Sequence, residues 1–451
     1  MEWIAIVAGA ACVAWGAAIL IRGGLLAGCL AVLVTGICFG YPWAHWKVGP
    51  VALSTDRLLW AALMGQYFIW RRLGLADPKP WRKADAALAA LVAVLVASTV
   101  THDWAADDFQ PAARLVFFYL LPAGLYWVAR QARIEGGSVR WVLCTWSVLG
   151  VYLGMMAVAE AAGWHQLVFP RYIVSPVYPE FLGRGRGPLL NPVGNGILLA
   201  TSLAAVMLWW PAAGRWGKLA GAAAAGAIAA GLGATLTRSV WLGGLATVGF
   251  VAGLTVPRPW RGVLAGVLVA AVLGAVACRE HLVAFQRDRG LSARETAESV
   301  HLRPMLAEIA CRMFRDRPLL GCGFGQYLNE NRYYLADRSS DRPLEKARPY
   351  VQHNLLLSLL VETGLLGAGL AVLVLSLWFR DAWRLWQAEH APQWARNAAL
   401  LFMALWINYT INGLFHEVSL IPMVNATMFW GAGMSAGLAA RTAAVPRAQP
   451  D

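Results

Sequence analysis

The stretch RPYVQHNLLLSLLVETGLLGAGLAVLVLSL runs from Arg348 to Leu377 and is almost entirely apolar from Leu355 onward. Because a helix of about 20 apolar residues crosses a bilayer, this stretch predicts a membrane span. The span opens with His353 and Asn354, directly after a segment rich in arginine. Polar residues at the end of a span lie at the water–lipid boundary and are candidates for a functional site.

The composition of the whole chain agrees with a membrane protein. Of its 451 residues, 59% are hydrophobic and 14% are charged, whereas a soluble domain carries about 25% charged residues. The 23 tryptophans fit the same interpretation because Trp gathers at membrane interfaces. A net charge of +13 would suggest nucleic-acid binding in a soluble protein. Here the basic residues gather in short loops between apolar runs, so we expect no nucleic-acid partner.

Apolar runs of spanning length recur along the chain. They predict an all-α, polytopic transmembrane bundle of roughly 12 to 13 spans, since only helices and closed barrels satisfy the backbone in lipid. The N-terminal run has no basic region before it, so we interpret it as a first span and not as a cleaved signal. The candidate spans are residues 3–21, 23–40, 52–70, 84–101, 112–129, 139–160, 192–210, 217–235, 239–256, 262–278, 353–378, 397–413 and 419–438.

The loops that are richest in Lys and Arg fall on one side if these spans alternate in direction. Cytoplasmic loops carry this excess, so the N-terminus is expected outside and the C-terminus inside. The opposite side receives the stretch 161–191, the Thr237-Arg238 joint and the long segment 279–352. The predicted organisation is ten spans in 1–278, a large periplasmic loop at 279–352, C-terminal spans in 353–438 and a cytoplasmic tail at 439–451.

The outer segment 279–352 contains one region with helical spacing of apolar residues. It predicts an amphipathic helix at the membrane surface, ended by Pro318 and the glycines of GCGFG. Cys311 and Cys322 fall in this segment and could form a disulfide if it lies outside the cytosol. The apolar positions of the helix are Val300, Leu302, Met305, Leu306, Ile309, Met313 and Phe314.

Arginines on the predicted outer side are candidates for binding an anion. Arg238 sits between two apolar runs, where burying a charge is costly. Its planar guanidinium group can donate two parallel hydrogen bonds to a phosphate. The alternative is an arginine that reaches the lipid headgroups. Arg184 and Arg186 alternate with glycines before a span that starts near Asn191, and the alternative for them is a solvated basic loop. Arg303 cannot be distinguished from neighbouring basic residues by pattern alone.

His353 is a candidate general base. A helix N-terminus and nearby arginines both disfavour the imidazolium form, so the ring is expected to be neutral and able to accept a proton. Asn354 could orient a sugar or phosphate oxygen, or could simply cap the helix. Glu362 lies within the membrane and is expected to be paired. His416 and Glu417 form a second polar pair for which a structural role is favoured.

Four stretches resemble the O-antigen ligase and O-antigen polymerase superfamily of integral membrane glycosyltransferases. They are GRGPLLNPVGNGILLA, TLTRSVWLGGLA, SVHLRPMLAEIACRMFRDRPLLGCGFGQYL and VQHNLLLSLLVETGLLG, and together they cover roughly residues 180–370. The resemblance implies a GT-C-like bundle with one large outer loop. It also implies transfer of a glycan from undecaprenyl diphosphate at the periplasmic face of the inner membrane.

Position by position, the resemblance assigns the catalytic roles to Arg238, Arg303 and His353. The arginines would hold the diphosphate, and the histidine would take a proton from the acceptor hydroxyl. Substrate-binding roles would fall on a further group of residues, namely Arg184, Arg186, Asn191 and Asn354. The usual Asn-Pro-Asn of the family reads Asn-Pro-Val here, so its third position is not carried over.

Two other functions remain open at this stage. An O-antigen or exopolysaccharide polymerase would use the same chemistry on a lipid-linked acceptor instead of a lipid A-core sugar. A lipid-linked oligosaccharide flippase would also need many spans, but no pair of similar halves is evident. The sequence holds no spaced DxD carboxylate motif at the outer ends of the early spans and no P-loop, so we expect neither metal nor ATP, and no cofactor.

Overall fold

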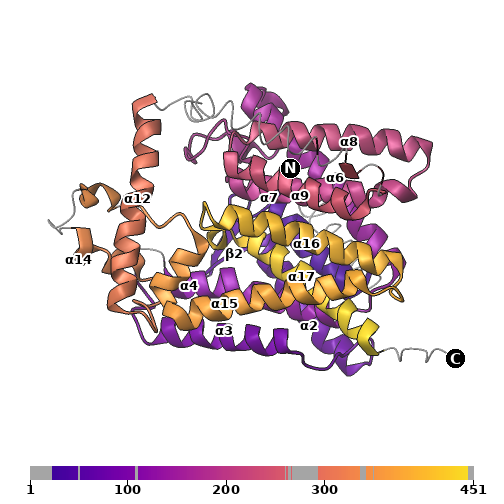
Figure 1. Cartoon of the computed structure of the whole chain (residues 1–451), viewed down its shortest axis with the longest axis horizontal. Helices are drawn as coiled ribbons and strands as arrows, with labels where there is room; N and C mark the ends of the chain where they lie inside the picture. The colour runs from indigo at the N-terminus through magenta and orange to yellow at the C-terminus, as the bar shows by residue number, and fades with distance from the viewer. Residues whose placement is uncertain are drawn as a thin grey trace.

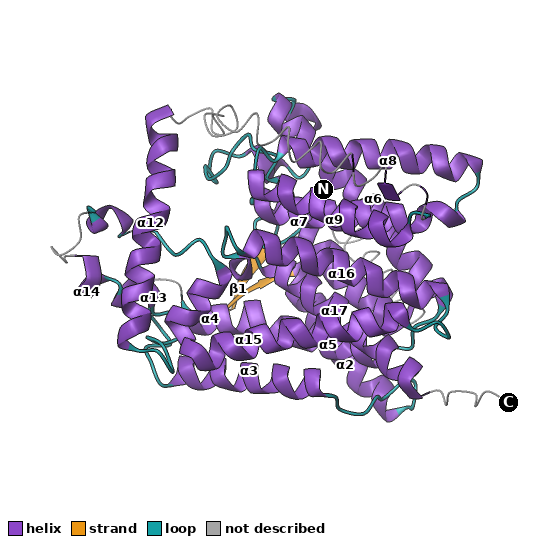
Figure 2. Cartoon of the chain, viewed as in Figure 1, coloured by secondary structure: helices purple, strands orange, loops and turns teal. Residues whose placement is uncertain are grey.

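The computed structural model describes residues 23–48, 51–106, 110–257, 293–335, 342–348 and 350–444, with 259, 261–262 and 266. Regular structure in these ranges is nearly all helical (Figure 2). The exception is an antiparallel hairpin of β1 (His45–Val48) and β2 (Val51–Ser54), in which His45 pairs with Ser54. The predicted spans 3–21 and, but for single residues, 262–278 lie outside the described residues.

A helix coincides with each predicted span in the described part of the chain, which confirms the all-α polytopic class. Six of the described helices are long and apolar enough to cross a membrane. The helices are Gly23–Cys38, α2 (Thr55–Arg72), α3 (Lys83–Val100), α4 (Pro111–Leu115) with η1 (Val116–Leu120) and α5 (Leu121–Gln131), α6 (Gly136–Ala162), α7 (Pro192–Trp209), α8 (Arg215–Ala234), α9 (Arg238–Thr255), α15 (Leu355–Gln387), α16 (Gln393–Gly413) and α17 (Pro422–Ala444).

Short helices shape the loops, and the outer segment adds the 24-residue helix α12. They are η2 (His165–Leu167), η3 (Arg171–Val174), η4 (Gly187–Leu189), η5 (Trp210–Ala212), α12 (Ala293–Asp316), α13 (Tyr327–Glu330), α14 (Arg332–Leu335), η7 (Leu344–Ala347) and η8 (Val418–Leu420).

Small residues let the long helices approach closely. A side chain on Gly154 of α6 would meet the backbone of Ala227 in α8, and one on Gly437 of α17 would meet the backbone of Arg130 in α5. Helix pairs in membranes pack in this way because lipid supplies little hydrophobic driving force. Figure 1 shows α3, α15, α16 and α17 running side by side, with α6, α7, α8 and α9 above them.

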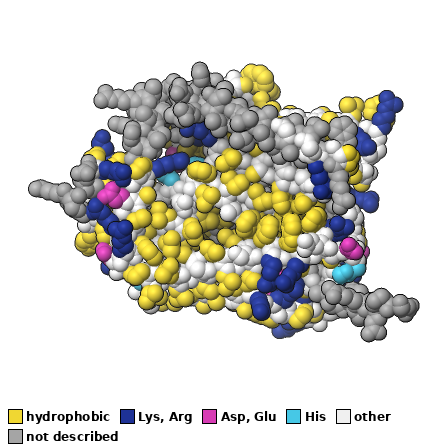
Figure 3. Space-filling model, viewed as in Figure 1, with side chains coloured by type: hydrophobic (Ala, Val, Ile, Leu, Met, Phe, Trp, Pro, Cys, Tyr) yellow, Lys and Arg dark blue, Asp and Glu magenta, His cyan; other side chains and the backbone are white. Residues whose placement is uncertain are grey.

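The surface has the pattern of a protein embedded in lipid. Figure 3 shows a broad band of hydrophobic side chains across the molecule, with Lys and Arg gathered toward both ends. Large apolar side chains on the outer helix faces are strongly exposed, for example Val148 at 70% and Leu219 at 63%. An exposed apolar area of this extent requires a covering, and here a bilayer supplies it. The chain is a multi-pass membrane protein.

The predicted amphipathic helix is present as α12, but the chain itself covers its apolar face. In Figure 1 it runs vertically at the left, whereas α3 and α15 run horizontally. Its buried residues form a small separate core with α13, α14, η7 and the start of α15, so protein covers this face. The position of α12 at the membrane surface stays a prediction. This core contains Met305, Leu306, Ile309, Ala310, Met313, Cys322, Tyr327, Leu335, Leu344, Ala347 and Val361. Cys311 is exposed, Cys322 is buried, and both are free thiols.

Helix α15 is interrupted at Gly364, and the glycine loop after α12 fills the gap. Gly364 has φ 62° and ψ −164°, a conformation that only glycine adopts readily. The backbone N–H groups of Cys322 and Gly323 donate to the carbonyls of Val361 and Glu362 at 2.9 and 3.0 Å. The loop therefore replaces the hydrogen bonds that the helix loses at the break.

Replacing Gly364 by Ala should destabilise the protein, because a Cβ there overlaps the backbone of Leu319. Backbone strain alone costs about 1–3 kcal/mol. Gly369→Ala in the same helix is the matched control, since a Cβ there meets nothing within 4 Å. It should change stability by less than about 1 kcal/mol, in the stabilising direction. Thermal unfolding of the two purified variants in detergent is the measurement, and equal midpoints would contradict this account.

Candidate functional site

The loop between α6 and α7 is built around the buried carboxylate of Glu160. The backbone N–H groups of Gly183 and Gly187 each donate to it at 3.2 Å, and Arg186 Nε lies 3.4 Å from it. Arg186 is fully buried and also donates to the carbonyls of Ile173, Tyr178 and Glu180. The structure therefore places Arg186 inside the loop as a structural tie and not on a ligand-facing surface.

Arg184 takes a different direction from Arg186. Its Nη2 donates to Thr237 Oγ1 at 3.1 Å, and its guanidinium lies 5.0 Å from the Phe181 ring. Gly183 and Gly185, on either side of it, have positive φ, and a side chain on Gly185 would meet the carbonyl of Ala234. The glycines thus let the loop backbone press against the α8–α9 joint and carry the Arg184 side chain to it.

The α8–α9 joint ends at Arg238, the first residue of α9. Thr237 is the N-cap residue, and its hydroxyl donates to the carbonyl of Thr235 at 2.8 Å. Ser239 follows Arg238, and its Oγ lies 3.1 Å from His416 Nε2. The joint therefore brings Arg184, Arg238 and His416 into one neighbourhood, although they come from separate parts of the chain.

The two asparagines assigned to substrate binding both act as helix caps. Asn191 Oδ1 accepts from the backbone of Val193 and Gly194 at the start of α7. Asn354 Oδ1 accepts from Leu357 N at 2.9 Å at the start of α15. Asn354 also donates from Nδ2 to the carbonyl of Leu414, at 2.9 Å. This second bond ties the mouth of α15 to the end of α16, two residues before His416.

His353 is exposed at the mouth of α15 and lies near Arg303 of α12. Its pKa is lowered from the ordinary value, first because the surrounding protein removes part of its water and second because the Arg303 charge opposes protonation. The ring is therefore neutral at neutral pH, with a lone pair available to accept a proton. The sequence pattern could not single out Arg303, whereas the tertiary structure does.

The described contacts join most of the sequence-predicted residues at one end of the bundle. The hydrogen bonds run from Arg184 to Thr237 in the α8–α9 joint, from Ser239 to His416, and from Leu414 to Asn354, which follows His353. The Arg303 charge lowers the pKa of His353 and so belongs to the same neighbourhood. Arg186 and Asn191 belong to the framework beside it. Among the described residues, no group of three or more His, Cys, Asp and Glu side chains could hold a metal ion.

A buried ion cluster beneath this site was not expected from the sequence. Arg114 Nη1 lies 2.8 Å from both carboxylate oxygens of Glu362, and its Nη2 lies 2.6 Å from Glu417 Oε1. Ser358 donates to the same Glu417 oxygen at 2.7 Å. The ring of Phe324, in the glycine loop, lies 4.6 Å from the guanidinium. The expected pairing of Glu362 is confirmed, and its partner is Arg114.

Arg114 and Glu160 are framework residues that the sequence analysis did not single out, although the sequence marks both. Each is a charge inside an otherwise apolar span, Arg114 in 112–129 and Glu160 at the end of 139–160. Such charges are expensive unless they are paired, so each predicts a partner elsewhere in the chain. The identity of that partner depends on which spans are neighbours, which the sequence does not state.

Comparison with known families matches one region of the chain, which contains part of this path. Residues 222–372 match the family model Wzy_C, described as O-Antigen ligase. The match covers about a third of the chain and supports the resemblance of this region to the O-antigen ligase and polymerase superfamily. No curated protein matches the chain. The O-antigen ligase region holds Arg238, Arg303 and His353, whereas Arg184 and His416 reach the same place from outside it. Similarity to this family supports a membrane enzyme of the glycosyltransferase type.

Replacing Arg114 by Met should destabilise the protein strongly, because two carboxylates would remain buried without their cation. The expected loss is about 3–5 kcal/mol. Arg348→Met is the control, since Arg348 and its partner Glu345 are both exposed, and removing such a pair costs less than about 1 kcal/mol. The midpoint of thermal unfolding in detergent measures both effects. Similar midpoints for the two variants would contradict a stabilising role for the Arg114 cluster.

Proposed function

We propose that the chain is an O-antigen ligase that moves a glycan from undecaprenyl diphosphate to a hydroxyl of the lipid A-core at the periplasmic face of the inner membrane. The observation that carries this proposal is the contact path that joins Arg184, Arg238, His416, His353 and Arg303 at one end of the bundle. The path combines cationic groups for a diphosphate with a neutral imidazole, and it overlaps the O-antigen ligase region.

The proposed reaction is a single displacement at the anomeric carbon of the donor glycan. The acceptor hydroxyl oxygen forms a bond to this carbon as the bond from the carbon to the phosphate oxygen breaks, and undecaprenyl diphosphate leaves. The hydroxyl proton passes to His353, which acts as general base. One displacement inverts the configuration at the anomeric carbon.

The arginines stabilise the leaving group in this scheme. Negative charge grows on the diphosphate as the sugar–phosphate bond breaks, and guanidinium groups fixed beside it lower the energy of that state. Arg238 and Arg303 hold the diphosphate, and Arg184 supports them from the α8–α9 joint. The donor is already activated as a diphosphate ester, so the reaction needs no nucleotide, and the arginines supply the positive charge that a metal would bring.

The structure suggests three changes to the roles drawn from the resemblance. Arg186 shapes the loop around Glu160, and Asn191 and Asn354 set the starts of α7 and α15. His416 joins the site, because its ring contacts Ser239 directly beside Arg238. We assign His416 to orienting the donor diphosphate or its first sugar.

The membrane orientation of the site follows from charge. The C-terminal ends of α2 and α15 and the N-terminal end of α16 lie at the opposite end of the bundle from the site, and they adjoin the loops richest in Lys and Arg. Because basic loops face the cytoplasm, the site faces the periplasm.

The acceptor separates an O-antigen ligase from an O-antigen polymerase. Purified protein is given one lipid-linked glycan donor and, in separate reactions, lipid A-core or a second lipid-linked repeat as acceptor. A ligase joins the glycan to lipid A-core, a polymerase lengthens the lipid-linked chain, and both release undecaprenyl diphosphate. A lipid-linked oligosaccharide flippase would release none, and that result would overturn the proposal.

His353→Ala should abolish glycan transfer, because the proposed reaction passes the hydroxyl proton to this imidazole. The variant should still insert into membranes and unfold at the wild-type temperature, since the ring is exposed. His390→Ala is the control, because His390 is an exposed histidine in the α15–α16 connection. Its transfer rate in the purified assay should equal that of wild type. A His353→Ala variant with normal transfer would end the assignment.

The charge of Arg303, together with the burial of the ring, should extend the reaction to lower pH. The general base must be neutral, and its lowered pKa keeps it neutral to a lower pH than an ordinary histidine. Arg303→Gln removes the positive charge and raises the His353 pKa, so the acid limb of the kcat/KM profile should move to higher pH. Arg303→Lys keeps the charge and should leave the limb in place. Identical profiles for both variants would show that Arg303 does not act on His353.

A further inference from the structure

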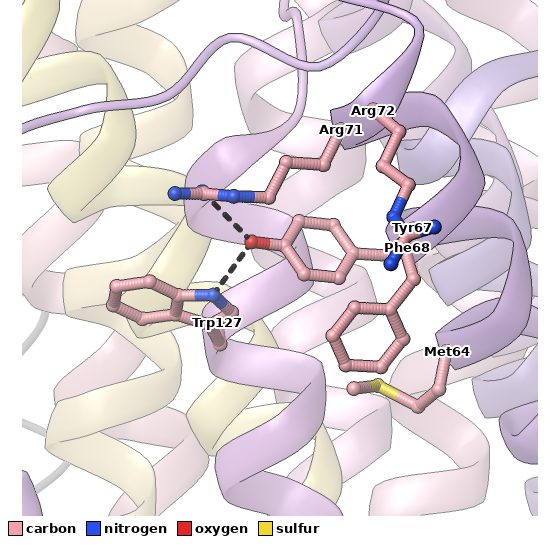
Figure 4. Close-up of a pocket in the computed structure, with 6 residues that line it drawn as sticks. All are labelled: Met64, Tyr67, Phe68, Arg71, Arg72 and Trp127. Carbon is pink, nitrogen blue, oxygen red and sulfur yellow. Dashed lines mark hydrogen bonds between the residues drawn. The ribbon is translucent and has the colours of Figure 1, made fainter.

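A cleft opens where the C-terminal end of α2 meets α5, at the end of the bundle away from the candidate site. Its volume is about 590 Å³, and it is lined by Met64, Tyr67, Phe68, Arg71, Arg72 and Trp127. Figure 4 shows Met64 and Phe68 on one side of the cleft and Trp127 on the other, with the two arginines at its rim. The walls are apolar and aromatic, and no acidic residue lines them.

The polar side chains of the cleft offer hydrogen-bond donors that are only partly used within the protein. The Tyr67 hydroxyl accepts hydrogen bonds from Trp127 Nε1 at 2.8 Å and from Arg71 Nη1 at 3.2 Å. Tyr67 is buried, and its own O–H donates to no group in the part of the chain that the structure describes. Arg71 and Arg72 form no ion pair with any described carboxylate. A ligand for this set must therefore accept hydrogen bonds and carry negative charge.

The position of the cleft restricts the ligand further. The flanking residues of α2 are large, apolar and exposed, with Phe68 at 58%, Ile69 at 59% and Leu73 at 66%. The Trp81 ring centroid lies 5.5 Å from that of Trp127, and Trp81 is itself exposed, as in the aromatic belt at a membrane interface. An arginine at a helix C-terminus can serve the helix dipole alone, but the dipole does not explain the adjoining apolar cleft.

We propose that this cleft binds an anionic phospholipid of the adjacent membrane leaflet. The phosphodiester accepts from the guanidinium groups of Arg71 and Arg72 and from the Tyr67 hydroxyl. An acyl chain lies against Met64, Phe68 and Trp127. A phosphodiester fits this donor set because it offers only acceptor oxygens, and the arginine fork can meet two of them at once. The cleft should bind an anionic lipid more tightly than a zwitterionic one, because the ammonium group of a zwitterionic headgroup is repelled by the two arginines.

Lipid retention in native mass spectrometry tests the proposal without reference to glycan transfer. Delipidated protein in detergent is given equal amounts of phosphatidylglycerol and phosphatidylcholine with identical acyl chains. Wild type should retain phosphatidylglycerol in preference, and Arg71→Gln with Arg72→Gln should weaken that retention by about tenfold or more. Arg133→Gln with Arg140→Gln is the matched control. It removes two exposed arginines from the α5–α6 region, outside the cleft, and should leave retention unchanged.

Two further measurements separate lipid binding from simpler explanations. Tyr67→Phe removes only the phenol oxygen and should reduce phosphatidylglycerol retention while the apolar walls persist. Free glycerol 3-phosphate should not displace the lipid, because it lacks the acyl chain. Equal retention of the two lipids by wild type would overturn the proposal. Equal losses in the two double variants would overturn it too, as would displacement by glycerol 3-phosphate.

Discussion

A single buried cation holds together three segments that are distant in the sequence. Arg114 bridges Glu362 and Glu417, which lie 248 and 303 residues further along the chain. In a low-dielectric interior, separating these charges is costly, so α4, α15 and the approach to η8 are fixed relative to one another. His353 stands at the start of α15 and His416 directly precedes Glu417. The same cluster therefore sets where both imidazoles lie.

The interruption of α15 contributes a second constraint. If α15 were unbroken, the glycine loop after α12 could not dock against it. Phe324, which lies in that loop, would then not reach the Arg114 guanidinium. The break at Gly364 frees carbonyls at membrane depth, and the loop N–H groups satisfy them. This exchange of backbone hydrogen bonds anchors the outer segment to the bundle. It explains in physical terms why the glycines of GCGFG and of α15 occur together in one chain.

Much of the fold could be predicted because hydrophobicity is a local signal. Most described spans begin and end within a few residues of the positions that composition predicts, since crossing lipid requires a fixed length of apolar helix. The exceptions are α15 and α17, which continue past the predicted ends at 378 and 438 to Gln387 and Ala444. The amphipathic pattern of α12 likewise predicted a helix, but periodicity says only that one face is apolar. It does not say whether lipid or protein covers that face, and the packing of α12 against α13, α14 and η7 shows that protein does. The β1–β2 hairpin was not predicted at all.

The sequence by itself determined that this chain is a polytopic helical membrane protein, and its motifs indicated Arg238, Arg303 and His353. It determined these things because span length, charge asymmetry and short motifs are properties of neighbouring residues. Only the tertiary structure distinguished Arg184 from Arg186. Arg184 reaches the α8–α9 joint, whereas Arg186 binds the carboxylate and carbonyls of its own loop. Only the tertiary structure brought His416 to Ser239 and paired Arg114 with its carboxylates. These outcomes depend on which helices are neighbours, and packing among distant segments decides that.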